Sequence, residues 1–199
     1  MPYGERKTQI IETAAQLFSE RGYHATSVRD IAAALDLQGG SLYAHIQSKE
    51  EVLWLIVERA AEQFFEAVRP LAESDLPPDE KLRRAVHAHI RVITDDLAAA
   101  TVYFHEWRFL EEEHRNTFLE QRREYEHLWR EMVREGMEKG VLRNDEDPKY
   151  MAILILSAMN WLYHWYRPDG PLSPDEIAER FWRMLLEGLQ APVFEVPTA

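Results

Sequence analysis

The sequence predicts an all-α protein of about nine helices, with an N-terminal three-helix, helix-turn-helix domain followed by a larger helical domain. Two observations predict this class. Apolar residues recur at spacings of three and four along most of the chain, which is the period of an amphipathic helix. Capping residues, glycines and prolines stand at the ends of these runs, while alternating strand-like runs are almost absent. We place the two domains over residues 1–47 and 48–199.

The N-terminal domain is predicted to hold three short helices. The apolar face of the first is formed by Ile10, Ala14, Leu17 and Phe18. Gly22 is its natural C-terminal stop. Ser27 and Asp30 make a capping box that opens the second helix, and Asp36 suits the left-handed turn that follows it. A third helix is expected over residues 39–46.

The second domain begins with a long helix along which the two domains are expected to join. Ser48 and Glu51 form its capping box, and its apolar face continues to about Val68. Pro70 and the stretch 74–78 then break the helical pattern.

Five more helices are predicted beyond this break. Three are expected over residues 79–94, 96–113 and 117–139. A strongly apolar helix follows the N-cap and proline pair Asp147-Pro148 and ends at Tyr166. A capping box over Ser173–Glu176 starts the last helix, which ends near Gln190.

Composition indicates a cytoplasmic protein with a real core. Of the 199 residues, 46% are apolar, which is enough to bury a core in one or two small domains. No apolar run approaches the length of a membrane-spanning helix, and the polar start does not resemble a secretory signal. The chain has no cysteine, so disulfides, thiolate metal sites and cysteine nucleophiles are excluded.

The stretch from Thr26 to Glu50 has the layout of a helix-turn-helix, whose second helix enters the major groove of DNA. The leading edge of that helix, residues 38–41, is small and polar, so its backbone can approach the bases closely. Leu42 and Ile46 are expected to pack inward. The residues predicted to contact bases or phosphates are Thr26, Ser27, Arg29, Gln38, Gly39, Gly40, Ser41, Tyr43, His45 and Lys49.

Four runs, in the expected order and spacing, resemble the TetR family of transcriptional regulators: Ala14 to Tyr23, Thr26 to Ala32, Gly40 to His45, and Ser48 to Leu53. Asp36 departs from the glycine usual in the turn, and Ile46 from the usual phenylalanine. The resemblance implies a homodimeric repressor that binds a pseudo-palindromic operator. It also implies release by a small ligand in the C-terminal domain, with the long fourth helix as the lever.

The formal net charge of −12 is unusual for a DNA-binding protein. Residues 1–47 carry four Lys/Arg against five Asp/Glu, so the remaining residues carry −11. A nearly neutral DNA-contacting domain on an acidic second domain is compatible with local DNA contact, because the acidic part is repelled from non-specific phosphate. Net charge therefore neither supports nor excludes DNA binding.

The last two predicted helices are apolar on more than one face. These residues are Ile153, Leu154, Ile155, Leu156, Met159, Trp161, Phe181, Trp182, Leu185 and Leu186. A helix that is apolar all round must be covered on all sides. With the family resemblance, we expect the same pair of helices from a second subunit to cover them. A monomeric core is the alternative.

Two further segments, Gln121–Glu126 and Asn160–Gly170, resemble the TetR branch that responds to acyl-coenzyme A thioesters, including regulators of fatty-acid and sterol degradation. The resemblance implies an acyl-CoA effector and no other cofactor. In this reading, coenzyme A phosphates meet Arg122, Arg123 and Arg167, and the acyl channel is lined by Trp107, Met159 and Tyr163. Alternatively, the arginine pair binds Glu126 and neighbouring acids. A drug-sensing regulator of efflux genes is the second functional class.

One constellation suggests an enzyme instead. Glu111–His114 and Glu124–His127 both contain the Glu-x-x-His motif of di-iron helical bundles. Thirteen residues separate them, too few for two spanning helices facing one metal centre. Phosphate-cradling glycine loops, nucleophile elbows and zinc-protease motifs are absent from the sequence. We therefore expect a regulator rather than an enzyme, without catalytic or metal-binding residues.

Overall fold

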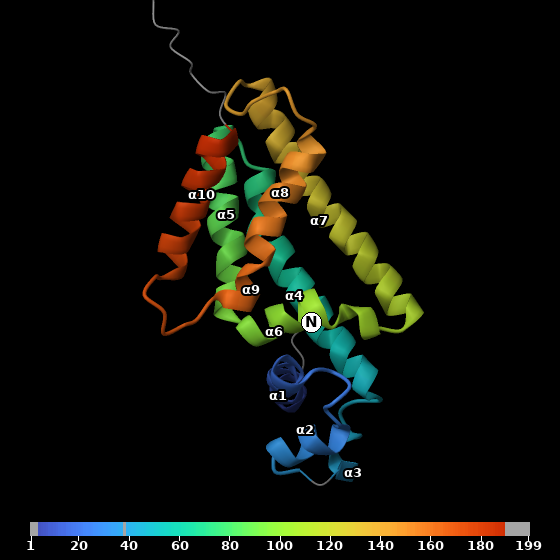
Figure 1. Ribbon diagram of the computed structural model, residues 1–199. Helices are drawn as coiled ribbons and strands as arrows, with labels where there is room; N and C mark the ends of the chain where they lie inside the picture. Colours follow the sequence, from blue (N-terminus) through green and yellow to red (C-terminus); the bar gives the residue numbers. More distant parts are fainter. Residues whose placement is uncertain (1–3, 38, 190–199) are drawn as a thin grey trace, which may run out of the picture.

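The computed structural model describes residues 4–37 and 39–189. Every regular element in these ranges is a helix, which confirms the predicted all-α class (Figure 1). None of these helices combines the length and apolar character needed to span a membrane. In chain order they are α1 (Glu5–Arg21), α2 (Val28–Ala34), α3 (Gly39–Leu42), α4 (Lys49–Ala72), α5 (Pro78–Asp95), α6 (Leu97–His105), the 3₁₀ turn η1 (Trp107–Phe109), α7 (Glu112–Glu138), α8 (Pro148–Asn160), α9 (Leu162–Trp165) and α10 (Pro174–Leu189).

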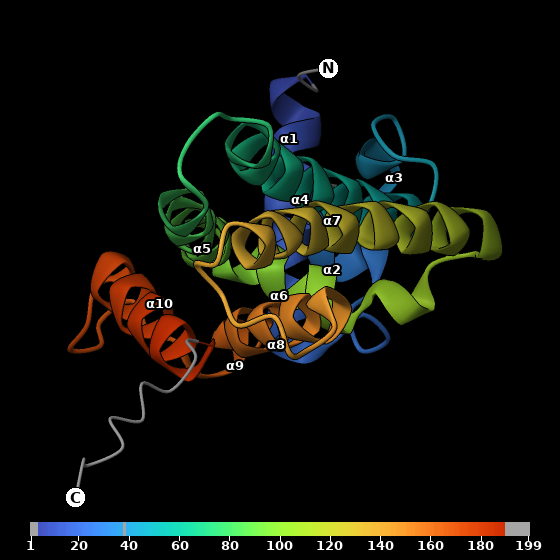
Figure 2. The same ribbon diagram turned by 90° about the horizontal axis from the view of Figure 1, so that it is seen from above.

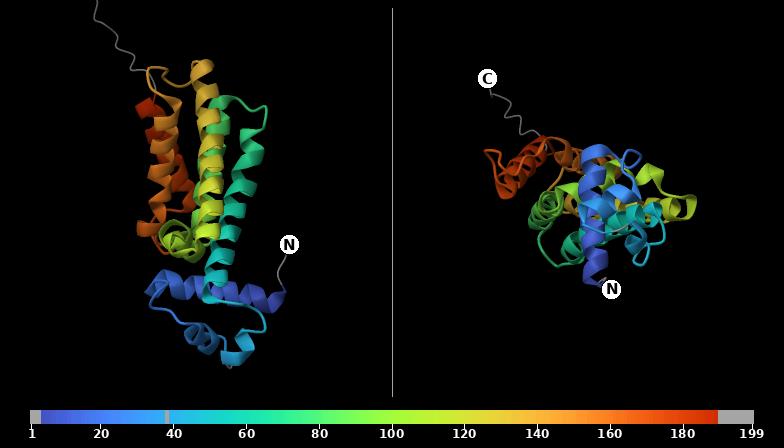
Figure 3. Two further views of the ribbon diagram at one scale, coloured as in Figure 1. Left: turned by 90° about the vertical axis from the view of Figure 1, so that its right-hand side faces the viewer. Right: turned by 90° about the horizontal axis from the view of Figure 1, so that it is seen from below.

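Helices α1 to α3 form a head, and helices α4 to α10 form a body. Figure 3 shows α1 lying across the lower end of the long body helices, with α2 and α3 beyond it on the far side from the body. Helix α4 belongs to both parts, because it packs against α1 at one end and against α5, α6 and α7 along its length. Seen from above, α10 lies on the outside of the body next to α5 (Figure 2).

Helix α1 ends and helix α2 begins at the residues that the sequence indicates. The Ser27 backbone N–H donates to Asp30 Oδ2 at 2.7 Å, and the Asp30 N–H donates to Ser27 Oγ at 3.2 Å, completing the capping box. Asp36 adopts a φ of 54°, the left-handed conformation in which asparagine and aspartate are tolerated. The next N–H, of Leu37, donates to the Ala32 carbonyl at 2.9 Å, a bond that closes the helix in the manner of a Schellman motif.

The prediction of a single helix over residues 96–113 is wrong. Helix α6 ends at His105, η1 follows, and Leu110 is extended with ψ of 144° before α7 begins at Glu112. The apolar periodicity continues through this corner because Leu110 is itself buried. The helical spacing of apolar residues therefore does not indicate the change of chain direction between α6 and α7.

Four other boundaries differ from the predicted ones, the first being the start of α7 at Glu112 instead of residue 117. Helix α4 continues through Pro70 to Ala72, although this proline has no N–H to donate to the preceding turn. Helix α3 ends at Leu42 and is followed by turns. Trp161 separates α8 from α9, where one helix is expected. The caps at residues 147 and 173 are as predicted.

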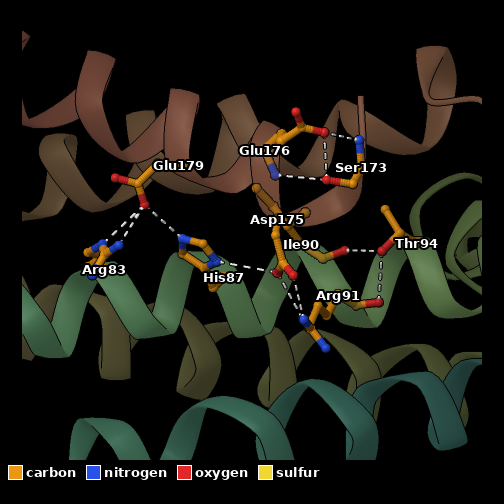
Figure 4. A network of polar contacts seen from close by, with 9 residues as sticks. All are labelled: Arg83, His87, Ile90, Arg91, Thr94, Ser173, Asp175, Glu176 and Glu179. Atoms are coloured by element: carbon orange, nitrogen blue, oxygen red, sulfur yellow. Dashed lines mark hydrogen bonds and ion pairs between the residues drawn. The ribbon is translucent and has the colours of Figure 1, made fainter. Parts of the chain in front are cut away.

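Helix α10 is held on α5 by a row of polar contacts (Figure 4). Arg83 Nη2 lies 2.9 Å from Glu179 Oε2, and Arg91 Nη2 lies 2.6 Å from Asp175 Oδ2. His87 stands between them and contacts both carboxylates. Beside this row, α10 buries apolar side chains, namely Ile177, Ala178 and Trp182.

Candidate functional site

The outer face of the head carries the predicted DNA-contacting side chains around α3. Ser41 and His45 are exposed, and Tyr43 is 58% exposed despite its size. Leu42 and Ile46 are buried, as predicted, and fix this segment on the head core. Gly39 and Gly40 form the start of α3, while Gln38 lies outside the described residues. A protruding tyrosine beside small polar residues can reach a phosphate or a base edge.

Thr26 and Lys49, which were predicted to contact phosphate, form hydrogen bonds within the head instead. Thr26 is 1% exposed, and its hydroxyl donates to the backbone carbonyls of Leu17 and Gly22. Lys49 Nζ donates to the carbonyl of Tyr23 at 2.9 Å and to that of Thr26 at 3.0 Å, and it lies 4.0 Å from the centre of the Tyr23 ring. Both side chains stabilise the head, which corrects the expectation that they are free to bind phosphate.

Ser27 and Arg29 remain on the surface of the head. The Ser27 hydroxyl contacts Asp30 Oδ2 at 2.6 Å, so it serves first as a helix cap. Hydrogen bonds from the Ser27 hydroxyl and from the Ser27 backbone N–H hold the pKa of the Asp30 carboxyl below its usual value. Arg29 is exposed, and within the described residues its guanidinium has no carboxylate partner. It is therefore a cation that this face can offer to DNA.

The body holds a partly open cavity of about 470 Å³ between its long helices. Its lining is mainly aromatic, with rings from α4, α6, η1, α7 and α9. Of the predicted ligand residues, Trp107, Arg122 and Tyr163 line it. The other lining residues are Phe64, His89, Tyr103, Phe104, Phe118, Tyr125, Glu126, Ile153, Leu156, Ser157, Asn160 and Trp161. An apolar cavity with a few polar groups is the usual form of a small-molecule site.

The remaining predicted ligand residues lie elsewhere. Met159 is fully buried and packs in the core beside the cavity rather than in its wall. Arg123 is exposed, and the exposed Arg167 donates to the Tyr166 carbonyl. None of the three lines the cavity. Within the described residues, neither Arg122 nor Arg123 forms the alternative ion pair with Glu126.

Three polar side chains from three helices form a polar chain in the cavity wall. Tyr125 Oη lies 2.8 Å from His89 Nδ1, and His89 Nε2 lies 3.0 Å from Asn160 Oδ1. Burial lowers the pKa of His89 to about 3, against a smaller opposing effect of the hydrogen bond to Asn160. Burial also raises the pKa of nearby Tyr103 to about 12, although the Arg122 charge opposes this. These groups are neutral near pH 7. No motif in the sequence pointed to the polar chain.

The turn η1 touches both the cavity and the head. Trp107 lines the cavity and stacks on Phe118 with ring centres 5.1 Å apart. On the head side, Phe109 stacks on Tyr23 at 5.8 Å. The neighbouring Glu106 is buried and accepts a hydrogen bond from the Tyr23 backbone N–H at 3.3 Å. A shift of this turn therefore alters contacts with both regions.

The two Glu-x-x-His motifs do not converge. His114 Nδ1 lies 2.9 Å from Glu50 Oε1, and its ring stacks on Trp54 with centres 4.5 Å apart. His127 lies near Glu131, one turn farther along the same α7. Among residues 4–37 and 39–189, no group of three or more His, Cys, Asp or Glu side chains is arranged to hold a metal ion. His114 instead joins α4 to α7.

Comparisons with known proteins agree with this arrangement. Residues 10–54 match the family "Bacterial regulatory proteins, tetR family", and residues 75–189 match "Tetracyclin repressor-like, C-terminal domain". The chain is 33% identical over 189 residues to the HTH-type transcriptional repressor KstR2 of Rhodococcus jostii (strain RHA1), covering 94% of this chain and 92% of that protein.

Two solved structures extend the likeness to the fold. The TetR family regulator PfmR of Thermus thermophilus is 36% identical, with a TM-score of 0.84 and coverage of 92% of this chain and 99% of that chain. AibR, solved in complex with isovaleryl coenzyme A and operator DNA, is 32% identical, with a TM-score of 0.83 and coverage of 92% and 98%.

Proposed function

The chain belongs to the TetR family of bacterial transcriptional regulators, and we propose that it is a repressor that binds a pseudo-palindromic operator as a homodimer and is released by an acyl-coenzyme A. Its relatives are regulators and not enzymes. In this proposal residues 1–47 bind DNA, residues 48–199 bind the ligand and the second subunit, and the protein acts in the cytoplasm. The observation that carries it is η1, which joins an aromatic cavity to the head.

The proposed DNA contacts centre on α3 and the exposed cations near it. Tyr43, Ser41 and His45 would contact phosphates or base edges, and Arg29 would contact the backbone. Lys49 would act indirectly, by tying the Tyr23 and Thr26 carbonyls to the start of α4. Tyr43→Ala and Arg29→Ala should weaken operator binding without changing thermal unfolding. Lys49→Ala should instead lower the unfolding temperature, and an unchanged temperature would contradict the indirect role.

Exposed apolar side chains support a homodimer through α8, α9 and α10. Leu154, Trp161, Trp165 and Met184 are between 43% and 58% exposed. Such large apolar groups gather where a partner covers them. Sedimentation of the purified protein should give a dimer, and Met184→Glu should give a monomer. A monomeric wild-type protein would remove this part of the proposal.

The effector class is supported by the cavity and by one relative. The cavity is lined mainly by aromatic rings that suit an acyl group, and Arg122 at its wall offers a guanidinium that pairs with phosphate. The relative AibR was solved with isovaleryl coenzyme A. We propose that the acyl group of the effector occupies the cavity and that Arg122 and Arg123 on α7 meet the coenzyme A phosphates.

Release of DNA would follow from the position of η1. An acyl group against Trp107 would move η1, and with it the contacts that Phe109 and Glu106 make to Tyr23 in the head. Changing a nearly complete DNA-bound state into a nearly complete free state requires a preference of about 5.5 kcal/mol for the released form.

A fluorescence-anisotropy assay with DNA upstream of the gene tests the whole proposal. Acyl-CoAs should release the DNA, whereas free fatty acids, coenzyme A alone and hydrophobic drugs should not. Phe109→Ala should still bind acyl-CoA but release DNA poorly. Arg108→Ala is the matched control, because Arg108 is exposed in the same turn and, among the described residues, its side chain hydrogen-bonds to the His105 carbonyl rather than to the head. Release by drugs and by no thioester would favour the efflux-regulator alternative.

A further inference from the structure

The polar chain in the cavity wall has a fixed direction. His89 is neutral, so one ring nitrogen donates and the other accepts. Asn160 Oδ1 can only accept, which places the hydrogen of His89 on Nε2. His89 Nδ1 must then accept, and the Tyr125 hydroxyl donates to it. Each donor points the same way, from Tyr125 through His89 to Asn160.

The amide nitrogen of Asn160 is the free end of this chain. Its carbonyl oxygen is committed to His89, while its NH₂ group has no acceptor among the described residues. Asn160 lines the cavity, so this amide nitrogen is available to donate a hydrogen bond to a ligand there. Because His89 binds the oxygen end of the Asn160 amide, the nitrogen end faces the cavity as a hydrogen-bond donor.

We infer that the amide nitrogen of Asn160 donates a hydrogen bond to a carbonyl oxygen of the effector. Ligand specificity would then depend on a carbonyl as well as on an apolar group. This inference rests on the proposed acyl-CoA effector and deepens it. The carbonyl has two possible sources, the thioester itself or a second carbonyl on the acyl group. His89 and Tyr125 are positioning residues, since they hold the amide without needing to touch the ligand.

Matched ligands that differ by one carbonyl test the inference on the full-length protein. Isothermal titration compares decanoyl-CoA with S-decyl-CoA, a thioether that lacks the thioester carbonyl. A second pair compares 3-oxodecanoyl-CoA with decanoyl-CoA. One neutral hydrogen bond corresponds to an affinity ratio of about three- to tenfold. We expect this ratio in the first pair if Asn160 bonds to the thioester carbonyl, and in the second pair if it bonds to the carbonyl on the acyl chain.

Substitution of Asn160 should abolish whichever ratio the wild-type protein shows. Asn160→Asp keeps an acceptor for His89 but presents an oxygen to the ligand, and Asn160→Leu removes the donor at similar volume. The ratio is measured within each protein, so a general loss of affinity does not obscure it. Tyr150→Phe is the matched control, because Tyr150 is exposed on the same helix, α8, and does not line the cavity, and it should retain the wild-type ratio.

The outcomes separate the two proposals. Equal affinity for both members of both pairs in the wild-type protein overturns the role of Asn160 and leaves the acyl-CoA effector intact. A ratio that survives in Asn160→Asp and Asn160→Leu overturns it as well. Failure of every coenzyme A compound to bind the wild-type protein overturns the proposed effector, and this inference with it.

Discussion

The helix caps of the head join residues that are near each other in sequence, whereas the polar chain of the body joins residues from distant helices. Ser27 and Asp30 cap one helix across three residues. The polar chain of the body joins His89, Tyr125 and Asn160 from α5, α7 and α8. The head is therefore specified by short sequence runs, and the ligand cavity by the way in which the body packs. The difference predicts that each region responds to a different kind of substitution.

The largest expected effect is on the aromatic packing of the body. Trp129 is fully buried on α7, and Trp129→Ala should lower the free energy of unfolding by about 3–5 kcal/mol, because a large cavity is left behind. Urea unfolding followed by tryptophan fluorescence measures this change. All six tryptophans lie beyond residue 48, so fluorescence reports the body.

Tyr43→Ala is the control from the head. Because Tyr43 is exposed, its removal should change the unfolding free energy by less than about 0.5 kcal/mol, although it weakens DNA binding. Similar destabilisation by the two substitutions would break the contrast between a packed body and a head whose outer face is kept free for DNA.

The second effect is a pH dependence that belongs to the body. The unfolded chain takes up a proton on His89 below about pH 6.5, but the folded chain does so only near pH 3. The stability that the neutral imidazole contributes is fully present above pH 6.5 and is lost as the pH falls. Between pH 6.5 and pH 5 the loss should be about 2 kcal/mol.

His89→Gln removes this titration while keeping a side chain that forms hydrogen bonds. Chemical unfolding at several pH values should therefore give a flatter curve for the variant than for the wild-type protein over this window. Parallel curves would show that His89 does not titrate differently in the folded and unfolded chains, and the neutral polar chain would then be wrong.

The smallest effect concerns the local caps of the head. Ser27→Ala removes the cap of α2 and should destabilise the head by about 1 kcal/mol. Amide hydrogen exchange in α1 and α2 should detect this, while tryptophan fluorescence should barely change. Ser41→Ala, an exposed serine that caps no helix in the described head, is the comparison. Equal exchange in both variants would mean that the cap does not limit local opening.

The head could be predicted closely from the sequence because its signals are local. The caps at Ser27 and the left-handed Asp36 follow from residue types within a few positions. The errors arose where a contact spans a longer distance. Lys49 looked free for DNA, but it is held by the carbonyl of Tyr23, which lies 26 residues earlier.

The cavity was only partly predictable for the same reason. Trp107, Arg122 and Tyr163 were identified through resemblance and line the cavity, whereas Met159, Arg123 and Arg167 were named on the same basis and do not. The polar chain needs the register of three packed helices, which no sequence run encodes by itself. The corner at Leu110 was missed because an extended buried leucine continues the apolar spacing of a helix.

The attachment of α10 has a consequence for salt titrations. Its contacts with α5 include the exposed ion pairs of Arg83 and Arg91, and mobile ions screen such pairs. In the proposed dimer α10 is part of the subunit interface, so added salt would loosen that interface while it also displaces counterions from DNA. The number of phosphate contacts inferred from the slope of operator affinity against salt concentration would then be too high. A covalently linked dimer, compared with the free protein, would separate the two contributions.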